Sequence, residues 1–435
     1  MQLYKFQKDA LDALSGYDNV LLAWQMGTGK TVSSIEQARR FSSDFLVCLV
    51  LKSTVGQWLE CIKEQLPDHK AFNGYKKSKN DGIDAFISYA GKKSLVLGYD
   101  AYKQKSAEKL RKYIEKNNEN FTMICDESSL IGHMNSERTR AVIHTKTAHK
   151  ILLSGTPAAG GRLETLIPSA HMLGWNISKR DFLNNYCVVK NWTNPAMPWV
   201  PIQIITGYKN IDDLHIQLEN HGTSFITMEE AGVQLPETSD VFIDTGTLEK
   251  QYKEMKKDGI TVIDGRQIVG DTPLTKMLCL RQICSMYSKE RRGAVKELIE
   301  QADGERVVIF YNWNAEKNAL LKICEELDRP ASIVSGKEKN LKNYEKKKDC
   351  VIICQYQAAA MGLNLQKARI AIFYSPCLSY SDFEQAKARI HRIGQKKSVV
   401  FYYPLCKGSI EEKVYSTLKE RKSYTVELFK QEIGP

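Results

Sequence analysis

The chain has 435 residues, 43% of them hydrophobic and 26% charged, with a formal net charge of +11. This length suggests two or three domains, and the composition excludes a disordered or collagen-like chain. The positive charge fits a polyanionic partner such as nucleic acid. No apolar run approaches the roughly 18 residues of a membrane span, and the amino terminus has no signal sequence. We therefore expect a soluble, cytoplasmic protein with no membrane partner.

Short apolar runs alternate with helical patterns through the first third of the chain. Strands are predicted at residues 20–23, 45–51, 94–97, 121–125 and 150–153, and helices at 31–40 and 57–65. Strands that are apolar on both faces and alternate with helices are typical of a parallel sheet covered on both sides. The pattern predicts an α/β domain over residues 1–157.

The alternation stops after residue 157 and restarts after residue 236. Residues 158–235, which carry three tryptophans and a group of prolines, are predicted to form a mostly helical or irregular appendage to the first domain. Further strands are predicted at residues 306–311, 350–354, 370–374 and 399–403, and helices at 313–327 and 410–422. A second α/β domain over residues 236–435 is therefore predicted.

A glycine-rich loop follows the first predicted strand and opens a helix. It consists of Met26, Gly27, Thr28, Gly29, Lys30 and Thr31. Backbone N–H groups in such a loop can cradle phosphates, and the start of the helix adds positive potential. Lys30 would neutralise the β- and γ-phosphates and Thr31 would hold Mg²⁺, although Trp24 stands where the usual motif begins with glycine. The loop predicts a nucleotide site.

An acidic pair, Asp126 and Glu127, directly follows the fourth predicted strand. A lone pair of this kind more often lies at the start of a helix. At the carboxyl end of a parallel strand, however, it lies at the edge where ligands bind. Asp126 can hold Mg²⁺ through water, and Glu127 can orient or deprotonate the attacking water. The position predicts a Walker B acid.

Two further segments have one structural and one functional interpretation. Ser154-Gly155-Thr156-Pro157 has the composition of a turn, but after the fifth strand it is a candidate coupling element between the nucleotide and another ligand. The amide of Gln7 could pair with the edge of an adenine. Taken alone, Gln7 is better interpreted as a solvated glutamine on an amphipathic helix.

Arg389 and Arg392 belong to a block from Gln385 to Gln395. Their spacing predicts that they share one face of a helix, which Gly394 then ends. A guanidinium keeps its charge and grips phosphate oxygens in a bidentate fork. Arginines on a separate domain could therefore complete a nucleotide site when two domains close.

Eleven cysteines are scattered without a CxxC pair or a histidine cluster. Zinc sites normally need such spacing, so we expect reduced, mostly buried thiols and no zinc.

The order of these motifs resembles that of the superfamily 2 helicase-like ATPases. The series is Gln7, 27–31, 126–127, 154–157, 362–365 and 385–395. Residues 360–366, 385–395 and 408–413 narrow the resemblance to the Swi/Snf-type DNA translocases. This resemblance implies two RecA-like lobes with parallel sheets flanked by helices, and an ATP site in the cleft between the lobes.

The resemblance also implies roles for individual residues. Lys30, Asp126 and Glu127 would act in catalysis with Mg²⁺, Arg389 and Arg392 would be arginine fingers, and Gln385 would lie beside them. Gln7 would read adenine, and Gly362 would contribute to the ATP site. Double-stranded or branched DNA would contact both lobes through Lys52, Gly98, Tyr99, Ser154, Gly155, Thr156, Gly362, Leu363 and Asn364.

The function implied is ATP hydrolysis that drives movement along duplex DNA without necessarily separating its strands. The compact chain favours a bacterial or phage protein of replication, repair or defence, in the cytosol near the nucleoid and with replication or repair proteins as partners. An RNA or DNA strand-separating helicase and a nucleotide-gated DNA-binding scaffold are the alternatives. The family usually has other residues at Trp24-Gln25 and Ser128-Ser129, so this chain departs from the family pattern beside the glycine loop and beside the acidic pair.

Overall fold

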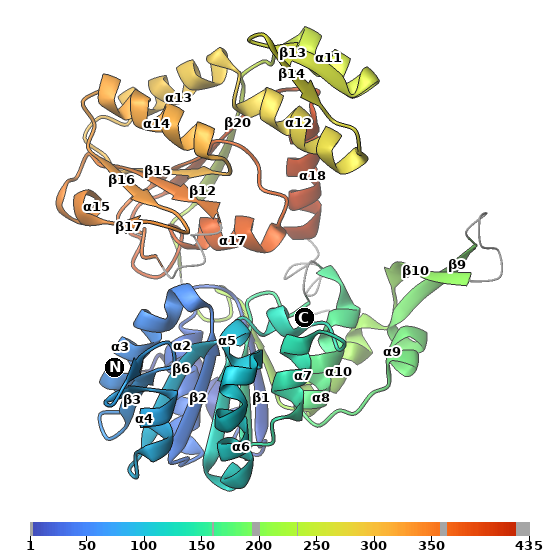
Figure 1. The fold of residues 1–435 in the computed structure, drawn as a ribbon, viewed down its shortest axis with the longest axis vertical. Helices are drawn as coiled ribbons and strands as arrows, with labels where there is room; N and C mark the ends of the chain where they lie inside the picture. Colours follow the sequence, from blue (N-terminus) through green and yellow to red (C-terminus); the bar gives the residue numbers. More distant parts are fainter. Residues whose placement is uncertain (1–2, 159–160, 194–200, 233, 357–362, 423–435) are drawn as a thin grey trace. The chain divides into compact units, whose positions relative to one another are not determined.

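The computed structural model describes residues 3–158, 161–193, 201–232, 234–356 and 363–422. These residues form two compact units, and the chain passes from unit 1 to unit 2 between Gln234 and Leu235. Each unit is built around one seven-stranded sheet (Figure 1). Among the described residues, no helix is long and apolar enough to cross a membrane.

The sheet of unit 1 is parallel throughout, with the strand order β11-β1-β8-β7-β2-β6-β3. Its strands are β1 (Asn19–Trp24), β2 (Phe45–Val50), β3 (Lys70–Asn73), β6 (Lys93–Gly98), β7 (Phe121–Cys125), β8 (His149–Leu153) and β11 (Thr223–Ile226). All five residues of β7 are buried, because helices cover both faces of the sheet. The parallel α/β fold predicted for this part of the chain is confirmed.

Alternate side chains of these strands pack against two different sets of helices. One face carries α1 (Lys5–Ala13), α2 (Lys30–Arg40) and α3 (Val55–Gln65), which bury side chains such as Leu11, Ile35 and Trp58. The other face carries α4 (Ile83–Ser88), α5 (Tyr99–Lys103), α6 (Glu108–Lys116) and α7 (Glu137–His144). Side chains that alternate across a strand therefore build two separate cores.

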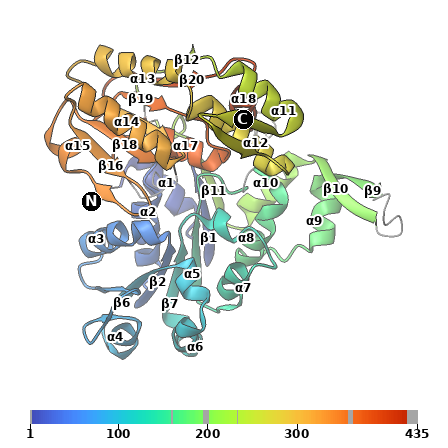
Figure 2. The ribbon, with the colours of Figure 1, turned by 45° about the horizontal axis from the view of Figure 1, so that its top comes forward.

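The predicted helical or irregular appendage contains more strand than expected. Its helices are α8 (Ile167–Met172), α9 (Lys179–Tyr186) and α10 (Ile211–Asn220), but β9 (Cys187–Thr193) and β10 (Pro201–Tyr208) form an antiparallel hairpin beside α9 (Figure 2). Its last strand, β11, pairs with β1 and completes the sheet of unit 1. The sequence prediction missed β11 because four residues are too few to show a strand pattern.

The sheet of unit 2 has the order β12-β20-β19-β15-β18-β16-β17, and all its pairs are parallel except β16 with β17. Its strands are β12 (Thr238–Asp244), β15 (Val307–Tyr311), β16 (Ala331–Val334), β17 (Lys339–Asn340), β18 (Val351–Gln355), β19 (Ile370–Phe373) and β20 (Val399–Leu405). This sheet confirms the second parallel α/β fold that the sequence predicted.

Helices again cover both faces of this sheet. One face packs on α13 (Lys289–Gln301) and α14 (Asn314–Glu326). The other packs on α15 (Lys342–Lys346), α17 (Tyr380–Ala388) and α18 (Ile410–Lys422). Beside them lies a small subdomain of α11 (Glu249–Asp258), the hairpin β13 (Ile260–Ile263) and β14 (Arg266–Val269), and α12 (Pro273–Ser285).

Candidate nucleotide site

The glycine-rich loop joins β1 to α2 and has the backbone shape of a phosphate loop. Gly27 and Gly29 adopt positive φ angles of 89° and 83°, which residues with a side chain rarely adopt. Thr28 is buried, and its Oγ1 donates a hydrogen bond of 2.7 Å to the carbonyl of Gln25. The loop is therefore folded into a defined turn at the start of an 11-residue helix.

Lys30 folds back over this turn. Its Nζ donates to the carbonyl of Trp24 at 2.8 Å and to that of Gln25 at 3.3 Å. Thr31 follows it in the first turn of α2 and is half-buried. The ammonium group is thus held against the loop by two main-chain carbonyl oxygens, and its predicted role in phosphate binding stays a prediction.

The Ser154–Thr156 segment, which follows β8, lies directly against the loop. A methyl group added to Gly155 would come within 2.9 Å of Met26 Cγ and 3.5 Å of Lys30 Nζ. Ser154 and Thr156 are buried, and Ser154 Oγ accepts a hydrogen bond of 3.1 Å from the Thr156 N–H. The segment therefore packs directly against the loop, and its role as a coupling element stays a prediction.

Gln7 is not solvated, so the interpretation that its sequence context favoured is wrong. It lies on the buried face of α1 with Leu11, and its Nε2 donates a hydrogen bond of 2.8 Å to the carbonyl of Thr28. Any side chain at Gly29 would collide with that amide, since its Cβ would lie 2.4 Å from Gln7 Nε2. Gln7 therefore touches the loop, where a base-reading glutamine would be expected.

Asp126 and Glu127 follow β7, two strands from β1 in the sheet. The carboxyl ends of parallel strands share one edge, so the acidic pair and the glycine loop lie on the same edge. The Asp126 carboxylate accepts hydrogen bonds from Trp58 Nε1 at 3.0 Å and from the Glu127 N–H at 3.0 Å. Glu127 has a φ of 49°, an uncommon conformation for a residue with a side chain, which marks a sharp turn at the end of the strand.

Unit 2 differs from the prediction at the arginine block. The helix α17 ends at Ala388, so Arg389 and Arg392 do not share a helical face and Gly394 does not end the helix. The chain leaves the helix because the Arg389 carbonyl accepts from the Leu365 N–H at 3.0 Å. Gln395 then stabilises the following turn. Its Nε2 donates to the Ala368 carbonyl at 2.8 Å, and its Oε1 accepts from the Lys396 and Lys397 N–H groups.

Arg392 and Asn364 bring together two of the motifs that lie apart in the sequence. Arg392 Nη1 donates a hydrogen bond of 2.7 Å to Asn364 Oδ1. Burial lowers the pKa of Arg392, and its Nε has no hydrogen-bond partner among the described residues. Gln385 is also buried, with an Oε1 that lacks a partner in the same described set. Both groups could therefore accommodate an additional polar ligand.

The residues expected to contact DNA differ in exposure. Lys52 and Asn364 are exposed, Leu363 is buried, and Gly362 lies outside the described residues. Gly98 packs against the hydroxyl of Tyr75, whose ring lies 5.3 Å from Lys52 Nζ. Tyr99 is buried and its hydroxyl donates to the carbonyl of Asp126 at 2.6 Å, so this side chain supports the acidic pair.

Trp24 and Gln25, which differ from the usual family residues, connect the loop to β11 by hydrogen bonds. Trp24 Nε1 donates to Ser224 Oγ at 3.0 Å, and Gln25 Oε1 accepts from the Met228 N–H at 2.9 Å. Ser128 is buried beside the acidic pair. Trp24 and Gln25 therefore anchor the loop to β11 and the residue Met228 that follows it, and neither replaces Lys30 or Asp126.

Unit 2 contains a buried ion pair that was not predicted from the sequence. Arg291 and Glu411 are both fully buried and paired, and Arg291 Nη1 also donates to the carbonyl of Tyr374 at 2.8 Å. Burial by itself would lower the pKa of Arg291, but the Glu411 carboxylate outweighs it and raises the pKa. The pattern Gly408-Ser409-Ile410-Glu411 was the signal that could have indicated this residue. Cys284 and Cys406 lie beside Glu411. The positively charged group next to them is the Arg291 guanidinium, which donates to Cys406 Sγ.

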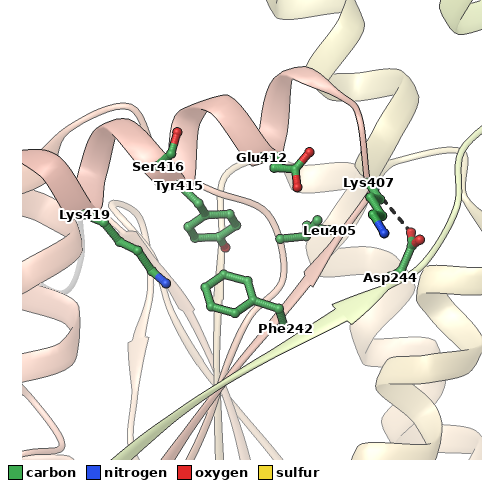
Figure 3. Close-up of a pocket in the computed structure, with 8 residues that line it drawn as sticks. All are labelled: Phe242, Asp244, Leu405, Lys407, Glu412, Tyr415, Ser416 and Lys419. Carbon is green, nitrogen blue, oxygen red and sulfur yellow. Dashed lines mark hydrogen bonds between the residues drawn. The ribbon is translucent and has the colours of Figure 1, made fainter.

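A hollow of about 420 Å³ lies between α18 and the edge strand β12, and Figure 3 shows the residues that line it. Phe242 and Tyr415 meet there edge to face, and Lys419 Nζ lies 4.3 Å from the Phe242 ring centroid. None of the predicted site residues lines this hollow.

Comparisons with known proteins match both units. The SNF2-related domain family matches residues 7–173, and the helicase conserved C-terminal domain family matches residues 290–394. A Xenopus laevis protein, "SWI/SNF-related matrix-associated actin-dependent regulator of chromatin subfamily A-like protein 1", is 24% identical over 96% of this chain and 43% of its own. The human "DNA annealing helicase and endonuclease ZRANB3" is 24% identical over 98% of this chain and 40% of its own.

A solved Sulfolobus solfataricus SWI2/SNF2 ATPase core in complex with dsDNA covers 98% of this chain and 93% of its own, with 17% identity and a TM-score of 0.42. The chain spans less than half the length of the two curated relatives named above. The two family matches fall on the two units that carry the predicted motifs, the first from Gln7 onward and the second up to Gly394. The chain therefore belongs to the SNF2-type, helicase-like family of superfamily 2.

Proposed function

We propose that this chain hydrolyses ATP when it engages DNA and uses the energy to move along double-stranded or branched DNA. One observation carries the proposal. The phosphate loop with Lys30, the buried amide of Gln7 and the Asp126–Glu127 pair lie together around one edge of the sheet in unit 1. Such a set belongs to nucleotide hydrolysis, and the family match supports coupling to DNA.

The residues at this edge fit a bound ATP with Mg²⁺. The loop turns at Gly27 and Gly29 leave backbone N–H groups at the start of α2, where phosphate is favoured. Lys30 would exchange its main-chain carbonyl partners for phosphate oxygens, and Thr31 and Asp126 would hold the metal. Bound Mg²⁺ would offset the negative charge of the phosphates, while Glu127 would orient the attacking water.

Arg389 and Arg392 are proposed to stabilise the charge that develops on the transferred phosphate. Two observations on Arg392 support this role. Its Nε has no hydrogen-bond partner among the described residues, and the residue is half-buried. The side-chain amides of Gln385 and Asn364 would lie beside these two arginines. Lys52 and the exposed Asn364 are the proposed contacts to DNA in units 1 and 2 respectively. Replication or repair proteins are proposed partners, and one relative is named a DNA annealing helicase and endonuclease.

ATP hydrolysis should be measured without nucleic acid and with duplex DNA, branched DNA, single-stranded DNA and RNA. We expect duplex-containing DNA to stimulate turnover, and we expect the salt dependence of this stimulation to reflect phosphate contacts. Lys30→Ala serves as the control for contaminating ATPases. Equal rates with and without DNA would refute a DNA-driven motor. Stimulation by RNA alone would indicate an RNA helicase, and DNA binding without turnover would indicate a scaffold.

A further inference from the structure

Asp126 is held by donors from two helices that lie on opposite faces of the sheet. Trp58, in α3, donates its indole N–H to Asp126 Oδ2 at 3.0 Å. Tyr99, the first residue of α5, donates its hydroxyl to the Asp126 main-chain carbonyl at 2.6 Å. The remaining carboxylate oxygen, Oδ1, accepts from the Glu127 N–H at 3.0 Å.

Both donors are fixed by packing. Trp58 is 2% exposed and lies in the core formed with α1 and α2, whereas Tyr99 is 3% exposed and lies in the core on the other face. The phenolic O–H of Tyr99 is a hydrogen-bond donor and is directed at the Asp126 carbonyl. The carboxylate and the carbonyl of one residue are therefore oriented by two independent cores.

We propose that Trp58 and Tyr99 are positioning residues that set Asp126 in the orientation needed to hold a divalent cation beside the nucleotide. The proposal rests on the proposed function, because Asp126 is a metal-holding residue only if ATP and Mg²⁺ bind here. Loss of a group that orients a metal-holding residue typically lowers the metal affinity by about 10- to 100-fold.

Phenylalanine at either position keeps most of the packing and removes the donor. With Mn²⁺ as the probe, electron paramagnetic resonance would measure how tightly the full chain binds Mn²⁺ in the presence of a non-hydrolysable ATP analogue. Trp58→Phe should weaken Mn²⁺ binding about 10-fold or more, and Tyr99→Phe should weaken it by a smaller factor. Analogue binding in EDTA should be unchanged in both variants, because neither donor touches the loop.

Tyr102→Phe is the matched control. Tyr102 is also buried in α5, but its hydroxyl bonds to Thr145 Oγ1 at 2.7 Å and not to Asp126. Loss of that hydroxyl should lower thermal stability as much as Tyr99→Phe does, without weakening Mn²⁺ binding. This comparison separates positioning from a general structural role.

Mn²⁺ affinity equal to that of the parent in both Trp58→Phe and Tyr99→Phe would overturn this proposal alone. So would an equal loss in Tyr102→Phe. Failure of the parent chain to bind Mn²⁺ together with the analogue would instead refute the proposed ATP site, and this proposal with it. If Trp58→Phe does not fold, the comparison of Tyr99→Phe with Tyr102→Phe still decides the question.

Discussion

Replacing Arg392 by alanine is expected to lower ATP turnover by about 10³-fold or more while leaving ATP binding intact, if Arg392 acts as an arginine finger. The charge on the transferred phosphate grows only during the reaction, so the loss should appear in kcat and not in the affinity for ATP. The side chain is half-buried, and within the described part of the chain Arg392 Nη1 donates to Asn364, which leaves other N–H groups for phosphate oxygens. Steady-state hydrolysis and equilibrium binding of a fluorescent ATP analogue would measure the two effects separately.

Arg369→Ala is the matched control in the same unit. Arg369 forms a partly exposed ion pair with Glu305 and has no proposed part in the reaction, so its loss should leave turnover within about twofold. Arg392→Lys should recover little of the lost rate, because an ammonium lacks the bidentate fork. A turnover loss in Arg392→Ala no larger than in Arg369→Ala would show that Arg392 is a surface residue without a catalytic role.

The buried ion pair of unit 2 should account for the second large effect. Glu411→Gln leaves the Arg291 guanidinium fully buried without its carboxylate. Breaking a buried pair in this way costs about 3–5 kcal/mol, and the amide that remains should bring the loss towards the lower end of that range. Urea denaturation followed by tryptophan fluorescence and circular dichroism would measure the free energy of unfolding.

Glu412→Gln is the control, because Glu412 is the neighbouring residue in α18 but is exposed. Its removal should change the free energy of unfolding by less than about 0.5 kcal/mol. The same unfolding energy in the two variants would mean that the pair contributes nothing net. A loss confined to Glu411→Gln would establish that Glu411, in the Gly408-Ser409-Ile410-Glu411 pattern, has a structural role.

The elements that the sequence predicted well are those whose pattern is local. The strands β1, β2, β7 and β15 are runs of apolar residues with helices between them, and the structure places them within a residue or two of the expected positions. The helix after the glycine loop begins at Lys30, one residue before the prediction. In these cases burial on both faces leaves an unbroken apolar run, which is visible without knowledge of the neighbours.

The predictions that failed depended on partners far along the chain. Spacing by itself favoured a helix through Arg392, but the hydrogen bond from Leu365 to Arg389 and the bonds of Gln395 favour a turn instead. Gln7 has the composition of a surface position, yet it is buried because the loop at Thr28 offers its amide a carbonyl. A short strand such as β11 is stabilised by pairing with β1, about 200 residues away.

The sequence by itself determined which motifs this protein carries: a glycine-rich loop with Lys30, an acidic pair after an apolar strand and an arginine block, because each motif is a run of neighbouring residues. It also determined the two parallel α/β units, since their strands are apolar on both faces. Only the tertiary structure decided which side chains serve those motifs. Trp58 and Tyr99 converge on Asp126 from opposite faces of the sheet, and Glu411 meets Arg291, 120 residues away. Such partners are set by how the strands and helices pack, and packing brings together residues whose separation in the sequence carries no signal of their contact.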